Sequence, residues 1–85
     1  SDRNVRINEI ISYHDGNYLI VHDRDFRSLN IEVKVMDISG RVIRHLDANN
    51  ESTIRINSNH LISGVYLLLL ERENNYETRK IFISN

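Results

Sequence analysis

Alternating apolar and polar residues dominate the chain and predict β-strands along most of its length. In the segment Ile31–Met36 an isoleucine or valine occupies every second position, as in a strand with one buried face. Thr53–Asn57 repeats this alternation, which places Ile54 and Ile56 on the inner face. Val65–Glu71 is apolar at almost every position, so we expect a central strand that is covered on both faces.

Turn-forming residues interrupt the chain at short intervals and divide it into separate strands. His14–Asn17 contains an Asp-Gly pair, which accepts the positive φ angles of a hairpin turn. In the tight turn Asp37–Gly40 the glycine takes the left-handed position, and Glu73–Asn75 forms the last turn. The expected strands are Asn4–Tyr13, Tyr18–His22, Ile31–Met36, Arg41–Leu46, Thr53–Asn57, Val65–Glu71 and Tyr76–Ile83.

The predicted fold class is all-β. Short strands with turn residues at intervals of about 8–12 positions predict a seven-stranded antiparallel β-sandwich of the immunoglobulin-like kind. Leu61–Ser63 is long enough for one helical turn, and no other helix is expected. In the polar connection Asp23–Asn30 we expect Phe26 and Leu29 to be tucked under the loop.

Length, charge and cysteine content narrow the classes of function. The 85 residues form one domain, residues 1–85. The net charge is −1 and acidic and basic residues are interspersed, so the sequence lacks the basic patch of a nucleic-acid-binding protein. There is no cysteine to form a disulfide or a thiolate site. No apolar run approaches the ~18–20 residues of a transmembrane helix, so no transmembrane segment is predicted.

The sequence contains no motif for catalysis or metal binding. The histidines are His14, His22, His45 and His60. They are far apart, without the spacing of a metal site. His22–Asp25 could offer two carboxylates to a cation such as Ca²⁺, but we interpret it as a solvated loop with an internal Asp-Arg pair. Ser39 and Ser63 precede glycines in loops rather than in the elbow of a catalytic serine, so we predict no enzyme activity, no cofactor and no metal.

The tyrosines leave open an alternative function in ligand binding. Tyr13 and Tyr18 flank the predicted Asp-Gly turn, and exposed aromatic rings are typical of sugar-binding sandwiches. We interpret the two tyrosines as a cross-strand pair, which contributes about 0.2–1 kcal/mol to the hairpin. Tyr66 is expected in the core, with its hydroxyl reaching a loop. A sugar-binding face stays open as the alternative interpretation.

Three motifs in a fixed order carry a resemblance to a known family. The residues of these motifs are Met36, Asp37, Gly40, Arg41, Val42 and Ile43; Leu61, Gly64 and Tyr66; and Arg79, Lys80, Ile81, Phe82 and Ile83. An isoleucine-rich polar strand with Ile54 and Ile56 lies between the first and second motifs. The pattern from Glu32 to Ile83 resembles the C-terminal sorting domains of proteins exported by the type IX secretion system of Bacteroidota.

The front of the chain departs from that family. Sorting domains usually open with a Pro-Asn-Pro segment, and this sequence contains no proline. In its place the stretch from Ser12 to Leu19 has the pattern Ser-x-x-x-Gly-Asn-x-Leu. This hairpin resembles short secreted Bacteroidota domains of unknown function with an immunoglobulin-like fold. A small secreted adhesion or ligand-binding module, for carbohydrate or protein, is therefore the alternative function.

The resemblance implies a non-catalytic export signal. A sorting domain is the C-terminal domain of a longer secreted protein, which crosses the periplasm and ends in the medium or on the cell surface. Its partner is the outer-membrane translocation machinery, which would recognise the closing strand, Arg79, Lys80, Ile81, Phe82 and Ile83. The alternative role of Arg79 and Lys80 is to protect a sheet edge against aggregation. Edge strands could also pair two copies into a weak dimer.

Overall fold

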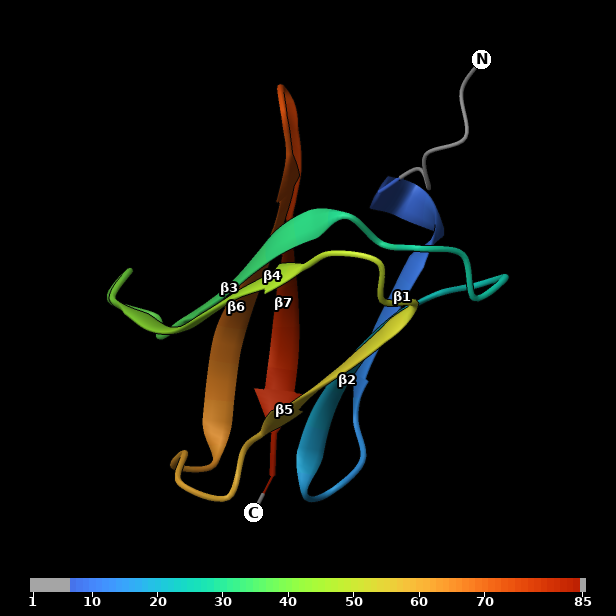
Figure 1. Cartoon of the computed structure of the whole chain (residues 1–85). Coiled ribbons are helices and arrows are strands. Elements are labelled where there is room, and N and C mark those ends of the chain that lie inside the picture. Colours follow the sequence, from blue (N-terminus) through green and yellow to red (C-terminus); the bar gives the residue numbers. More distant parts are fainter. Residues whose placement is uncertain (1–6, 85) are drawn as a thin grey trace.

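A computed structural model describes residues 7–84 of the chain, and it confirms the all-β fold with seven strands (Figure 1). The elements are η1 (Ile7–Glu9), β1 (Ile10–His14), β2 (Tyr18–Asp23), β3 (Ile31–Met36), β4 (Val42–Ala48), β5 (Thr53–Asn57), β6 (Gly64–Arg72) and β7 (Asn75–Ile83). The bounds of β3 and β5 are the predicted ones. Those of β2 and β7 differ from the prediction by one residue at one end, and those of β4 and β6 differ by one or two residues at both ends.

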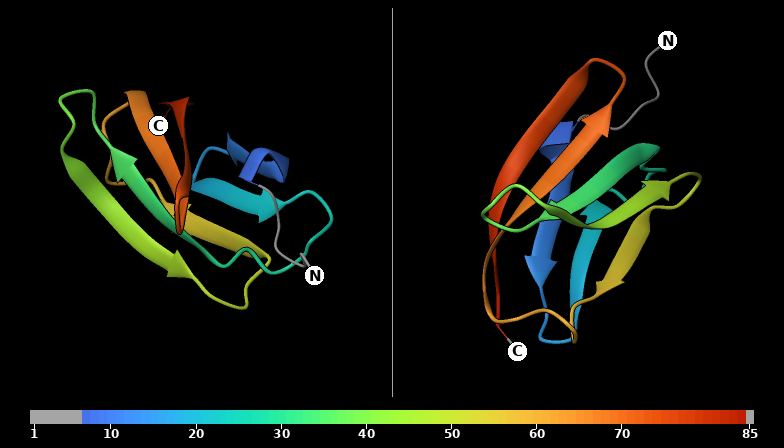
Figure 2. Two further views of the ribbon diagram at one scale, coloured as in Figure 1. Left: turned by 90° about the horizontal axis from the view of Figure 1, so that it is seen from above. Right: turned by 90° about the vertical axis from the view of Figure 1, so that its left-hand side faces the viewer.

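The strands form two antiparallel sheets that pack face to face. One sheet has the order β1-β2-β5 and the other has the order β4-β3-β6-β7. Figure 2 shows the two layers, with the β6–β7 hairpin extending past the other strands at one end. This arrangement is the immunoglobulin-like sandwich that the strand spacing predicted. It leaves β7 and β4 as the two edge strands of the larger sheet.

The core lies between the sheets and consists of the apolar residues that alternate along the strands. Its members are Ile10, Leu19, Val21, Leu29, Ile31, Val33, Val35, Ala48, Ile54, Ile56, Tyr66, Leu68, Leu70 and Ile83. The inward positions of Ile54 and Ile56 and the burial of Leu29 confirm the sequence-based expectation. Ile31, Val33 and Val35 are buried as well, while the residues between them are half-buried.

The central strand β6 is less buried than its composition suggests. Tyr66, Leu68 and Leu70 face the core, but Val65 is 40% exposed and Leu67 is half-buried. The prediction of cover on both faces is therefore wrong among the described residues. The sandwich has only two layers, so one face of each sheet meets solvent. The apolar run in β6 leaves an apolar row on the outside of the larger sheet.

Three expectations for the first sheet and its loop are wrong. The first strand begins at Ile10, because residues 7–9 form the short 3₁₀ helix η1; residues 4–6 of the predicted strand lie outside the described part of the chain. Tyr13 is opposite Ile20 in the sheet, so Tyr13 and Tyr18 do not form a cross-strand pair. Phe26 is 65% exposed and stacks on the ring of His22 instead of lying under its loop.

Candidate functional site

The closing strand β7 presents two different rows of side chains. Its inner row is Glu77, Arg79, Ile81 and Ile83, and its outer row is Tyr76, Thr78, Lys80 and Phe82. Ile83 is fully buried, whereas Phe82 is 62% and Tyr76 72% exposed. Because side chains alternate along a strand, the five residues predicted for recognition separate into these two rows. Lys80 and Phe82 point outward, and Arg79, Ile81 and Ile83 point into the sandwich.

Arg79 is held by contacts inside the molecule. Its guanidinium donates hydrogen bonds to the backbone carbonyls of Ile7 (3.0 Å) and Ile10 and to the hydroxyl of Ser12 (3.2 Å). Its Nε is also ion-paired with Glu77. These donors are occupied by partners of the same chain. Arg79 therefore joins β7 to the start of the other sheet. Its guanidinium is engaged inside the molecule and is not exposed for the predicted contact with a partner protein.

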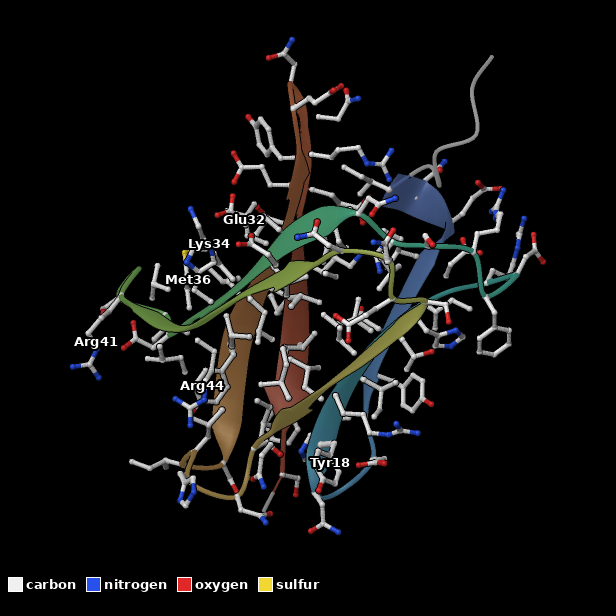
Figure 3. All side chains as sticks on the ribbon, in the orientation of Figure 1. Tyr18, Glu32, Lys34, Met36, Arg41 and Arg44 are labelled. Carbon is white, nitrogen blue, oxygen red and sulfur yellow. The ribbon has the colours of Figure 1, made fainter. Side chains whose placement is uncertain are left out.

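The outer row of β7 continues across the larger sheet as an apolar surface. Phe82 is opposite Val65 of β6, and Lys80 is opposite Leu67. Leu67 is in turn opposite Met36 of β3. We name Phe82, Lys80, Val65, Leu67 and Met36 the outer patch. Figure 3 shows Met36, Lys34 and Glu32 on the same side of β3. The outer patch combines an exposed aromatic ring, aliphatic side chains and a cation on one sheet face.

The first family motif builds a turn. The carboxylate of Asp37 accepts hydrogen bonds from the amides of Ser39 and Arg41 (both 3.0 Å) and from the Ser39 hydroxyl (2.6 Å). Arg41 adds an ion pair to the same carboxylate (3.2 Å), and Gly40 has the predicted positive φ of 92°. The Ser39 hydroxyl and these amides lower the pKa of Asp37 below its ordinary value. Asp37, Gly40 and Arg41 thus serve the connection between β3 and β4.

The second family motif forms a tyrosine corner. Tyr66 is buried, and its hydroxyl donates to the backbone carbonyl of Ile62, which confirms the predicted contact with a loop. Such a corner fixes the crossing from one sheet to the other in immunoglobulin-like domains. Leu61 packs against the core ahead of it, and Gly64 begins β6 at φ 158°. The motif residues Leu61, Gly64 and Tyr66 therefore hold the fold at this crossing.

The acidic loop after β2 is organised around a buried carboxylate. Asp23 is fully buried and accepts hydrogen bonds from the amides of Asp25 (2.9 Å) and Arg27 (2.8 Å) and from Nε of Arg27 (2.9 Å). Burial alone would raise the pKa of Asp23, but the side chain and amide of Arg27 and the amide of Asp25 outweigh burial and lower it. The Asp23 carboxylate is therefore the hydrogen-bond acceptor around which this loop is organised. The expected Asp-Arg pair exists, but its cation is Arg27 and its carboxylate is buried.

Sequence spacing did not reveal one group of potential metal ligands. Glu32, His45 and Asp47 place their ligand atoms within 4.8 Å of one another on the outer face of β3 and β4. The antiparallel register brings them together, since Glu32 is opposite Asp47 and close to His45. The side chains of Glu32 and His45 are already bonded to each other. The group is exposed, and such acidic groups are common without a metal.

The remaining histidines of the described chain serve other contacts. Nε2 of His14 lies 2.6 Å from the buried hydroxyl of Ser58, and that hydroxyl donates to the carbonyl of Asn17 (3.0 Å). Nδ1 of His22 donates to the backbone carbonyl of Asp23 (2.8 Å). His60 lies in the exposed connection that follows β5. His14 and His22 therefore fasten a turn and a loop at separate places.

Comparison with known proteins identifies the family. No helix among the described residues is long and apolar enough to cross a membrane. A search of curated proteins finds no match. The family model described as "Secretion system C-terminal sorting domain" matches residues 14–84, which include all three motifs. That family is known for sorting rather than for catalysis, and its domains interact with the secretion machinery. The chain belongs to this family: it is a C-terminal sorting signal for type IX secretion, which implies export to the medium or the cell surface.

Proposed function

We propose that the secretion machinery recognises this domain through the outer patch, with Phe82 and Lys80 as the main contacts. The observation that supports this proposal is the separation of β7 into two rows. The side chains of the inner row pack into the core or, in the case of Arg79, bond to other parts of the chain. In the outer row, Phe82 is 62% exposed. Large exposed apolar groups gathered on one face are typical of interaction surfaces. Aromatic residues, phenylalanine among them, are also enriched at protein interfaces.

Charge specifies the chemistry of the partner. Lys80 and Lys34 rise from the outer face of the larger sheet, beside Phe82 and the aliphatic side chains of β6. An apolar groove with an acidic rim fits such a surface, because the rim charges steer association and the apolar centre supplies affinity. Glu71 lies 3.9 Å from Lys34, so it partly neutralises that lysine. Lys80 is then the more effective of the two cations.

The domain is proposed to be the last one of a longer protein that crosses the periplasm before the outer membrane. The family description as a C-terminal sorting domain supports this organisation.

We also propose that the domain has no catalytic activity and binds no nucleic acid. The net charge of −1 supports the second point, and the engagement of Ser39 with Asp37 supports the first. Weak dimerisation through the edge strand β4 is proposed because β4 ends its sheet.

A second candidate function rests on the other sheet. The rings of Tyr13 and His22 meet edge to face at 6.2 Å, and Phe26 stacks on His22 at 5.0 Å. Together with Tyr18, which is 37% exposed, they give the β1-β2-β5 sheet an aromatic outer face. A carbohydrate ring stacks on such a face through its C–H groups. Binding to a glycan array that disappears in Tyr13→Ala would establish this activity in addition to sorting.

The proposed recognition is tested by transport. The 85 residues are fused behind a signal peptide and a fluorescent reporter in a host with a working type IX system. Phe82→Ser and Lys80→Glu are expected to retain the reporter in the periplasm, and the same result is expected for a deletion of residues 76–85. Phe26→Ser removes an equally exposed phenylalanine from the loop after β2, and Arg55→Glu reverses an exposed charge on β5 of the other sheet. Both controls should be exported. Normal export of the two β7 variants would contradict the proposal.

A further inference from the structure

Arg79 connects the two ends of the described chain. Its partners Ile7, Ile10 and Ser12 lie in η1 and β1, 72, 69 and 67 positions away in the sequence. The strand β7 contacts both of these elements at the side of the sandwich. No backbone ladder joins the two sheets there, because β1 pairs only with β2 and β7 only with β6 among the described strands. Arg79 therefore supplies three hydrogen bonds between these two edges.

The chemistry of arginine suits this position. Strand β1 has no partner strand on its second side, so the carbonyl of Ile10 needs a donor from elsewhere when the edge is covered. A guanidinium carries five N–H donors in a rigid plane and can bond several acceptors at once. Arg79 uses that plane for two carbonyls and a hydroxyl, while Glu77 holds its Nε. A lysine ammonium is a point donor and cannot span these acceptors.

The position is also protected from water. The side chain of Arg79 is 19% exposed, and the side chain of Glu77 is 35% exposed. Hydrogen bonds that involve a charged group are stronger than neutral ones, and partial burial strengthens them further. Among the inner-row residues, Ile81 and Ile83 hold the second half of β7 by apolar burial. The first half, toward Glu77, depends on Arg79 instead.

We propose that Arg79 is a positioning residue for sorting: by bonding residues 7–12 it holds β7 in the orientation that presents the outer patch. The inference rests on the proposed recognition through Lys80 and Phe82. It makes the start of the domain part of the signal. A preceding domain would join ahead of these residues, so damage or misfolding of residues 7–12 would free the first half of β7 and displace Lys80, the outer-patch residue next to Arg79. The position of β7 then depends on whether residues 7–12 are folded.

The test compares Arg79→Lys with a core variant of equal stability. Ile56→Val lies on β5 in the other sheet, and a second β5 substitution is added if needed until the two thermal midpoints agree. Hydrogen exchange is measured on the purified domain, and export is measured with the reporter fusion. In Arg79→Lys we expect the amides of β7 and of residues 7–12 to exchange about 10-fold faster than in the control, because the loss is local. Export should fall at least ~5-fold below the control, as expected for a contact worth about 1 kcal/mol or more.

The outcomes separate the two proposals. Uniformly faster exchange together with export equal to that of the matched core variant would show that Arg79 only adds stability, and the positioning role would be wrong. If Phe82→Ser is exported normally, the recognition surface is wrong, while exchange still decides whether Arg79 holds β7. If Arg79→Lys does not fold, Ser12→Ala replaces it, because it removes one acceptor of the same guanidinium and leaves the others. Unchanged exchange in β7 of Ser12→Ala would then overturn the inference.

Discussion

Two loops of this domain share one local design and differ in their surroundings. In the loop after β2 and in the turn after β3, an aspartate accepts hydrogen bonds from the amides two and four residues later. An arginine at the fourth position binds the same carboxylate in both. The amide of the third residue donates to the aspartate carbonyl at 2.9 Å in both. The repeated pattern is Asp-x-Asp-x-Arg in one loop and Asp-x-Ser-x-Arg in the other.

The two copies differ in burial and in the residue at the third position. Asp23 is fully buried, and Glu9 of η1 also binds its partner Arg27, whereas Asp37 stands in an exposed turn. Position three is Phe26 at φ 58° in the first loop and Gly40 at φ 92° in the second. A left-handed phenylalanine is uncommon, since a Cβ is unfavourable there. The comparison teaches that the same local hydrogen bonds can close the end of a sandwich or form an independent turn.

The largest effect is expected from removing the buried carboxylate. Asp23→Ala leaves two amides and Nε of Arg27 without their acceptor, so we expect the free energy of unfolding to fall by about 3 kcal/mol. Asp37→Ala should cost clearly less, because water can replace the lost acceptor in an exposed turn. Urea unfolding measures both. Equal losses would break the distinction between the loops, and Asp25→Ala, an exposed neighbour, serves as the control.

Acid should act through the same carboxylate. The pKa of Asp23 is lowered in the folded protein. Its ionised form therefore stabilises the fold at every pH above the ordinary aspartate pKa of about 3.9. That contribution is lost as the pH falls through the lower, folded pKa. We expect stability to be level above about pH 5 and to decrease below about pH 4. In Asp23→Asn the decrease should be shallower, which thermal unfolding from about pH 5 to well below pH 4 measures. An identical acid profile would contradict the role of Asp23.

The left-handed position is tested by a substitution at Gly40. Gly40→Val introduces a β-branched side chain at φ 92°, and no atom within 4 Å would obstruct the added Cβ. The cost is therefore that of the backbone alone, and we expect about 1–2 kcal/mol. Thermal unfolding measures it, with Ile38→Val at the exposed neighbouring position of the turn as the control. A loss below that of the control would show that the turn adopts another conformation.

The smallest effect is expected from the reverse change in the first loop. Phe26→Gly relieves the backbone strain at φ 58°, but it also removes the stack on His22 and adds flexibility to the unfolded chain. These contributions oppose one another, so the net change should lie within about 0.5 kcal/mol. A loss similar to that of Asp23→Ala would mean that the exposed ring is a major stabilising contact. Chemical unfolding of the two variants side by side decides this.

The sequence by itself determined the strands, most turns and the inward residues of the core. These features depend on the two-residue period of a strand and on glycine at positive φ, which are local properties. Alternation predicted the bounds of β3 and β5, and the spacing of Asp37, Gly40 and Arg41 marked both a turn and a family. The matching loop at Asp23 was missed, since phenylalanine occupies the place where glycine would have marked it. The repeated Asp-x-x-x-Arg spacing was the available clue.

Only the tertiary structure decided which side chains of the closing strand are available to a partner. The two-residue period of a strand places Arg79 and Lys80 on opposite faces, but it does not say which of the two faces lies toward the core. That choice depends on packing against β1, 69 positions earlier in the sequence, where the carbonyl of Ile10 needs a donor. Likewise, Glu32 meets Asp47 only through the register of β3 with β4. Contacts between distant segments depend on how sheets pair and pack, and local sequence patterns carry no record of that geometry.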